Sequence, residues 1–312
     1  MKDNKIIIVG DGAVGSSFAY TLVTKGIGRE IGIIDLNEKK SFGDAMDLSD
    51  ALSYSKPKEI YKATYSDCKD AKLVVITAGA AQKVGETRLD LVKKNIRIFK
   101  SMINNIVDSG FNGIFLVASN PVDILTYATW KFSNFPAHKV LGTGTSLDSA
   151  RFRLEISKLL NIDTRNVHAY IMGEHGDSEF PVWSHANVGG LQLYEWVSQL
   201  KSSVDEEKLL KTFDNVVNKA YKIIENKGAT YYGIATNLAK IAESILTDSN
   251  SIVAISAYLN GEYGLKNIYI GTPAVIGKDG INGVIELPLN DNEKENMKKS
   301  AEILKNLIEK IF

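Results

Sequence analysis

The sequence predicts an α/β protein in which a doubly wound parallel sheet is followed by an α+β domain. In the first half, short aliphatic runs alternate with longer segments whose apolar residues recur every three or four positions. Strands that alternate with helices in this way build parallel sheets. In the second half, helical patterns come first and strand-like segments follow. At 312 residues the chain exceeds what one hydrophobic core usually organises, so two domains are expected.

The strands expected in the first half are residues 6–9, 31–34, 73–77 and 114–118, with a weaker candidate at Val140-Leu141. A helix should follow Gly12, because apolar residues recur there every fourth position, and Gly26 stands where a C-terminal glycine would end it. A second helical stripe runs from Leu89 to Ile106.

The pattern changes after Gly144, so we place the domain boundary there, giving domains 1–144 and 145–312. The second domain should contain helices near 147–160 and 206–228, strand-like segments around 268–270, and an amphipathic terminal helix over 293–312.

Composition excludes several functional classes. Lys plus Arg and Asp plus Glu both number 37, which disfavours broad capture of nucleic acid or of an anionic membrane. The single cysteine, Cys68, excludes an intrachain disulfide and a thiolate metal cluster. No spacing of His, Asp and Glu predicts a metal site. No signal peptide or membrane span is evident, so a cytoplasmic location is expected.

The motif Gly10-Asp11-Gly12-Ala13-Val14-Gly15 lies between an expected strand and an expected helix, the context of a Rossmann dinucleotide site. Gly10 permits the tight turn, Gly12 lets the backbone approach a pyrophosphate, and Gly15 allows close helix packing. Asp35 ends the second strand, where its carboxylate can bind ribose hydroxyls and repel a 2′-phosphate. NAD is therefore favoured over NADP. The alternative, a glycine-rich turn and a solvated aspartate, leaves the coincidence of strand, helix and acid unexplained.

Catalytic chemistry is expected at His175, which lies between Gly173 and Gly176 and beside two carboxylates. An imidazole is the side chain best suited to exchange protons near neutrality. A structural loop histidine is the alternative. Asp148 and Arg151 are three residues apart on an expected helix, so they share a face and can point into one cavity. For them the alternative is an ordinary intrahelical salt bridge.

Several motifs in order resemble those of the lactate/malate dehydrogenase family, and within it the L-lactate dehydrogenase branch. The resemblance runs from residue 5 to the terminal helix. Beside the glycine motif, it rests on QKVGETR at 82–88, SNPVD at 119–123, LDSARFR at 147–153 and GEHGD at 173–177.

The resemblance implies an oxidoreductase of fermentative glycolysis that transfers hydride between NADH and a 2-oxo acid, with His175 as proton donor. Asp148 would fix the tautomer of His175 and favour its imidazolium form, and Arg151 would grip the substrate carboxylate. Arg88 follows a glycine-containing loop, 79–87, that suits a lid, and would polarise the reacting carbonyl once the loop closes. An exposed arginine is the alternative for Arg88, but its charge is unfavourable at a helix start.

Two further positions are implied by resemblance. Asn120 would lie near nicotinamide and substrate, and Thr230 would belong to the substrate pocket; both could instead be turn or helix residues. Gln82 occupies the position where similar malate dehydrogenases carry an arginine, so pyruvate is expected over oxaloacetate, whose second carboxylate would stay unpaired. Val84 stands where many relatives have proline. The alternatives are an enzyme for bulkier 2-oxo acids or for malate, and a non-catalytic NAD-binding protein.

Regulation is also implied by the resemblance. Arg153 and His168 match positions with which allosteric bacterial relatives bind fructose 1,6-bisphosphate between subunits, and a homotetramer is expected. Arg153 cannot share the inward face of Arg151, because two residues span about 200° of helix. The alternative is a surface arginine and a structural histidine.

Overall fold

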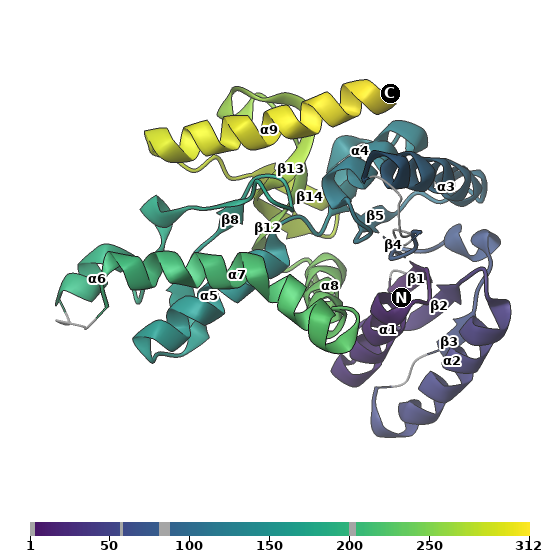
Figure 1. The fold of residues 1–312 in the computed structure, drawn as a ribbon. Helices are drawn as coiled ribbons and strands as arrows, with labels where there is room; N and C mark the ends of the chain where they lie inside the picture. The colour runs from purple at the N-terminus through teal and green to yellow at the C-terminus, as the bar shows by residue number, and fades with distance from the viewer. Residues whose placement is uncertain (1–3, 57–58, 81–87, 200–203) are drawn as a thin grey trace.

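The computed structural model describes residues 4–56, 59–80, 88–199 and 204–312 (Figure 1). Its main feature is a sheet with the strand order β14-β13-β12-β6-β5-β4-β1-β2-β3. The six strands from β3 to β6 pair in parallel, in the order 3-2-1-4-5-6 of a doubly wound sheet. The predicted fold class is confirmed. These strands are β1 (Lys5–Val9), β2 (Glu30–Ile34), β3 (Glu59–Lys62), β4 (Leu73–Ile76), β5 (Ile114–Val117) and β6 (Val140–Gly142).

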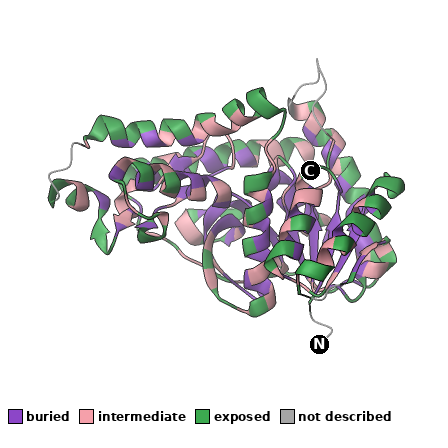
Figure 2. Ribbon diagram, turned by 90° about the horizontal axis from the view of Figure 1, so that it is seen from below, coloured by how far each residue is buried: buried purple, intermediate pink, exposed green. Residues whose placement is uncertain are grey.

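Helices cover both faces of this sheet, as the alternation of side chains in β1 makes clear. Ile6 and Ile8 pack with the residues of α1 (Ala13–Lys25) and α8 (Tyr232–Thr247). Ile7 and Val9 pack on the opposite face with α3 (Arg88–Asp108) and α4 (Val122–Ser133). Figure 2 shows the buried strands between helices whose outer surfaces are exposed. Burial on both faces explains why β1 reads as an uninterrupted aliphatic run.

Three antiparallel strands extend the same sheet: β12 (Ser251–Asn260), β13 (Lys266–Gly277) and β14 (Gly280–Val284). β12 meets β6 where Ser256 pairs with Gly142. The sheet therefore continues across residue 144, and the division of the chain into two domains stays a prediction. The strand expected near 268–270 is part of β13, whereas β3, β12, β14, α2 (Glu38–Asp50), α4 and α8 were not predicted.

The remaining long helices surround the segment that carries His175. α5 (Ser146–Leu160) packs against α7 (Glu206–Lys227), and α9 (Asp291–Ile311) packs against β13 and α4 (Figure 1). All three helices lie within a residue or two of the predicted ranges. The predicted glycine cap of α1 is also confirmed, because Gly26 has the left-handed φ of 72°. Within the described ranges, no helix combines the length and hydropathy needed to cross a bilayer.

Short elements complete the chain. The strands are β7 (Val167–His168), β8 (Ile171–Met172), β9 (Phe180–Pro181), β10 (Asn187–Val188) and β11 (Leu191–Gln192), and the short helix α6 covers Leu193–Gln199. Single turns of 3₁₀ helix cover Ala51–Tyr54, Tyr65–Cys68, Ala137–Lys139, Thr164–Asn166, Trp183–His185 and Glu262–Gly264.

Candidate active site

The glycine motif turns the chain from β1 into α1 at the carboxyl end of the parallel strands. Gly10 has a φ of +108°, and a Cβ there would lie 2.5 Å from the backbone nitrogen of Ala78. A Cβ at Gly15 would lie 1.9 Å from the carbonyl oxygen of Gly10, whereas one at Gly12 would meet nothing within 4 Å. Gly10 and Gly15 are therefore required by close packing. Gly12 instead leaves its backbone open to a ligand, as a pyrophosphate requires.

Asp35 at the end of β2 shapes this loop. Its carboxylate accepts hydrogen bonds from the backbone N–H of Asp11 at 2.6 Å and of Asn37 at 2.8 Å. Gly10, Gly12 and Asp35 line one cavity of about 680 Å³. The open backbone at Gly12, the first turn of α1 and the half-buried carboxylate of Asp35 fit the pyrophosphate and ribose of NAD.

Asp11 is a feature of this loop that sequence reasoning missed. Its carboxylate is buried, and Lys40 lies 3.2 Å from it. Burial and the nearby Asp44 raise the pKa of Asp11 to about 6, against the opposing effect of Lys40. The only sequence signal was an acidic residue between two glycines, where a carboxylate is not needed for binding phosphate.

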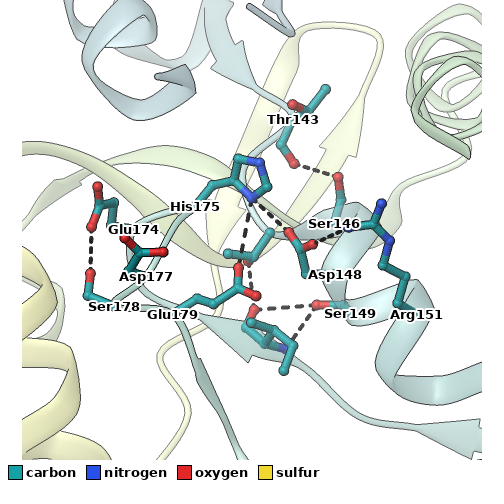
Figure 3. A network of polar contacts seen from close by, with 12 residues as sticks. Thr143, Ser146, Asp148, Ser149, Arg151, Glu174, His175, Asp177, Ser178 and Glu179 are labelled. Carbon is teal, nitrogen blue, oxygen red and sulfur yellow. Dashed lines mark hydrogen bonds and ion pairs between the residues drawn. The ribbon is translucent and has the colours of Figure 1, made fainter. Parts of the chain in front are cut away.

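The second site is built on α5 (Figure 3). One oxygen of Asp148 accepts a hydrogen bond from the Nη1 of Arg151 at 3.0 Å, and the other lies 2.8 Å from the Nδ1 of His175. The helical spacing thus does place Asp148 and Arg151 on one face. The intrahelical salt bridge and the contact with His175 coexist, because each uses a different oxygen of the same carboxylate.

Charge governs the behaviour of this cluster. Burial alone would lower the pKa of His175, but the carboxylates of Asp148 and Glu179 raise it well above its usual value. Burial alone would raise the pKa of Asp148, yet the imidazolium and the Arg151 guanidinium hold it below its usual value. With Nδ1 engaged by Asp148, Nε2 is the ring nitrogen left to exchange a proton with a ligand.

Asp123 is a second buried aspartate in this site, and its role was not predicted. It accepts hydrogen bonds from the backbone N–H of His175 at 2.8 Å and from the hydroxyl of Ser256 at 2.5 Å. Burial raises its pKa to about 6, although these two hydrogen bonds oppose the rise. The residue thus ties α4 and β12 to the backbone of His175. Its only sequence signal was its place in the SNPVD motif.

The loop that carries His175 is also hydrogen-bonded to β13 and α9. Gly173, with a φ of 98°, exchanges backbone hydrogen bonds of 3.0 and 2.9 Å with Gly271 of β13. The Ser300 hydroxyl of α9 accepts the N–H of Glu174 at 2.6 Å. α9 and β13 therefore fix the position of the loop that presents the imidazole.

A cavity of about 480 Å³ opens over the cluster. Asn120, Asp148, Arg151 and His175 line it, together with residues of α7. Thr230 lies between α7 and α8 and is not among the described residues that line this cavity.

The other predicted site residues are distributed as follows. Arg88 begins α3, but its side chain, like Gln82 and the rest of segment 81–87, lies outside the described residues. Arg153 is partly buried on α5, and His168 is exposed on β7. No described hydrogen bond or ion pair joins Arg153 to His168.

Comparisons with known proteins agree with this geometry. A family model for the NAD-binding domain of lactate/malate dehydrogenases matches residues 4–142, and one for their α/β C-terminal domain matches residues 145–312. An L-lactate dehydrogenase 1 of Enterococcus faecalis is 63% identical over 99% of this chain and 94% of its own. An L-lactate dehydrogenase of Lacticaseibacillus casei is 61% identical with the same coverage.

A crystal structure of a minor L-lactate dehydrogenase from Enterococcus mundtii, in its ligands-bound form, is similar over the whole fold. It is 44% identical to this chain, with a TM-score of 0.97, and the match covers 100% of this chain and 99% of the other.

Proposed function

Because the chain belongs to the lactate/malate dehydrogenase family, we propose that it is an NAD-dependent L-lactate dehydrogenase, interconverting pyruvate and L-lactate. The observation that carries this proposal is the contact of 2.8 Å between Asp148 and His175, with Arg151 on the same carboxylate. Residues 1–144 would bind the cofactor, and residues 145–312 would supply the proton donor and the substrate arginine.

The cofactor, when bound, supplies the hydride that reduces the carbonyl carbon of pyruvate. His175 gives the proton at Nε2 to the carbonyl oxygen, and Asp148 stabilises the imidazolium until that transfer. Arg151 binds the substrate carboxylate, for which its planar guanidinium is suited. Arg88 polarises the carbonyl, and Asn120, which lines the same cavity as His175, orients the substrate. In the reverse direction, neutral His175 accepts the proton of the L-lactate hydroxyl.

Substrate choice would be set by Gln82. A neutral amide leaves the second carboxylate of oxaloacetate without a partner in a closed pocket, which costs binding energy that pyruvate does not lose. The test is NADH oxidation by the purified protein with pyruvate and with oxaloacetate, for the native chain, Gln82→Arg and the neutral control Gln82→Met. We expect a preference for pyruvate that only Gln82→Arg reverses. A native preference for oxaloacetate would contradict the proposal.

The alternatives are distinguished by the same assay. A dehydrogenase for bulkier 2-oxo acids would reduce longer substrates faster than pyruvate. A non-catalytic NAD-binding protein would bind NADH without turnover, but such a protein has no use for a proton donor whose imidazolium is stabilised by a buried carboxylate.

The assembly and regulation follow the resemblance. We propose a cytoplasmic homotetramer in fermentative glycolysis, activated by fructose 1,6-bisphosphate bound at Arg153 and His168. Burial lowers the pKa of Arg153, so a phosphate partner would compensate an unfavourable charge. The test is the pyruvate rate with and without the bisphosphate, for the native chain and Arg153→Gln. Sedimentation velocity should find a tetramer, and activation should be lost in the variant; equal activation of both proteins would rule out this site.

A further inference from the structure

Glu179 is a buried carboxylate that the mechanism above does not use. It directly precedes β9, and its side chain is 6% exposed. Its Oε2 lies 3.8 Å from the Nδ1 of His175 and has no hydrogen-bond partner among the described residues. Figure 3 shows that it approaches the same ring nitrogen as Asp148, from another direction. An unpaired buried carboxylate is costly unless a charge nearby compensates it.

The two carboxylates near the Nδ1 of His175, those of Asp148 and Glu179, differ in how many positive charges lie beside them. Asp148 has both the imidazole and Arg151, with hydrogen-bonding distances to each. For Glu179, the one ion pair within 4 Å in the described part of the chain is with the imidazole. Asp148 is close enough to raise the pKa of Glu179, and Arg151 is close enough to lower it. Asp123 faces the loop from α4, where it accepts the backbone N–H of His175. Asp177 and Tyr221 line the cavity, where the Tyr221 hydroxyl donates to the Oδ1 of Asp177 at 3.4 Å.

The pKa of Glu179 also indicates that its charge and the proton of His175 depend on each other. Burial raises the pKa of Glu179 to about 7, although the nearby imidazolium opposes the rise. The carboxyl therefore becomes charged as the pH passes neutrality. Its negative charge then develops at the pH where a histidine ordinarily loses its proton, and this charge delays that loss.

We propose that Glu179 is a positioning residue that acts as a second carboxylate partner of the catalytic imidazole and keeps it protonated above neutral pH. The proposal rests on the proposed function, because a retained proton matters only if His175 is the donor. It adds to the role of Asp148 rather than replacing it: Asp148 orients the ring by a hydrogen bond, and Glu179 contributes charge at longer range.

The direct test is an NMR titration of the histidine rings in the protein without substrate. The chain has four histidines, and the signal lost in His175→Asn identifies the catalytic ring. In Glu179→Gln, the titration midpoint of His175 should fall by about one pH unit, the size expected on losing one nearby opposite charge. Glu179→Asp keeps the charge and should restore part of the shift.

Glu155→Gln is the matched control. Glu155 lies on α5, like Asp148, but its carboxylate contacts Lys158 and Lys219, at 3.2 and 2.9 Å, rather than the ring. This control should leave the midpoint of His175 unchanged. An unchanged midpoint in Glu179→Gln, or an equal fall in Glu155→Gln, would overturn the proposal. Should Glu179→Gln not fold, Glu179→Asp provides the test, with a smaller fall in the midpoint.

Kinetics give a second readout that a folding defect would not produce. In Glu179→Gln, the loss of pyruvate reduction at high pH and the loss of lactate oxidation at low pH should both move to lower pH. The substitution cannot change the overall equilibrium between pyruvate and L-lactate. The ratio of the pH-independent kcat/KM for pyruvate to that for L-lactate must therefore change by the same factor as the acid dissociation constant of His175. This comparison is corrected for the measured affinities for NADH and NAD. If the native protein reduces no 2-oxo acid, the proposed function fails, while the NMR result still decides whether Glu179 controls the His175 proton.

Discussion

Asp35 in the cofactor loop and Asp148 in the catalytic pocket are the same side chain in different surroundings. Asp35 is partly exposed and accepts two backbone N–H groups, at 2.6 and 2.8 Å. Asp148 is 4% exposed and contacts two cationic side chains, at 2.8 and 3.0 Å. Toward its own loop, Asp35 acts by geometry, because hydrogen bonds in a solvated loop fix a shape. Asp148 acts by charge, because burial strengthens its attraction to the imidazolium. Burial thus decides which property of a carboxylate is used.

The largest effect on activity is expected from replacing the proton donor, His175. His175→Asn should lower kcat for pyruvate by roughly 10² to 10⁴-fold, because general acid catalysis is lost. NADH affinity, followed by fluorescence titration, should stay within twofold, because the cofactor loop is a separate cavity. Near-native turnover would show that His175 is not the donor.

The buried carboxylate of Asp123 should also stabilise the folded protein. Asp123→Ala leaves the N–H of His175 and the hydroxyl of Ser256 without their acceptor, and each unsatisfied buried donor costs roughly 1–3 kcal/mol. Urea unfolding should find a free energy lower by about that sum, and kcat should fall because the loop shifts. Ser256→Ala removes one of the two bonds and should lose less. An unchanged unfolding midpoint in Asp123→Ala would show that the contact is not stabilising.

β1 and α3 were predicted because a local pattern coincides with burial. β1 is an aliphatic run buried on both faces, and α3 has apolar residues at a helical spacing. α2 was missed because few of its side chains are buried. The spacing of Asp148 and Arg151 predicted a shared face. The contact of His175 with Asp123 depends on tertiary packing, and its contact with Glu179, four residues further on, depends on the irregular loop between them. Asp123 lies 52 positions from His175, a separation that no local pattern encodes.

The role of Asp35 should be measurable as a change in cofactor affinity. Asp35→Ala frees the N–H of Asp11 and removes the acceptor for ribose, so NADH affinity should fall roughly tenfold, the equivalent of one to two hydrogen bonds. The preference for NADH over NADPH should narrow, because a charge that repels a 2′-phosphate is lost. Retention of both the affinity and the preference would contradict this role.

The smallest effect is expected at Lys40, which offsets the buried charge of Asp11. The pKa of Asp11 is about 6, so this carboxyl is neutral below that pH and charged above it. In Lys40→Met the pKa of Asp11 should rise further, because Lys40 lowers it. NADH affinity should fall a few-fold at pH 8, where the uncompensated carboxylate repels the pyrophosphate, and little at pH 5.5, where the carboxyl is neutral. A pH-independent loss would mean that Lys40 acts in another way.

The measurement that tests the central claim most directly is the pH dependence of kcat/KM for pyruvate in the native protein and in Asp148→Asn. The raised pKa of His175 means that the imidazolium persists above its usual titration range and is lost only as the pH rises through the higher value. The native profile should therefore stay level past neutrality and then fall. In Asp148→Asn the fall should begin at lower pH, because the carboxylate that stabilises the imidazolium is gone. Coincident profiles for the two proteins would contradict the account.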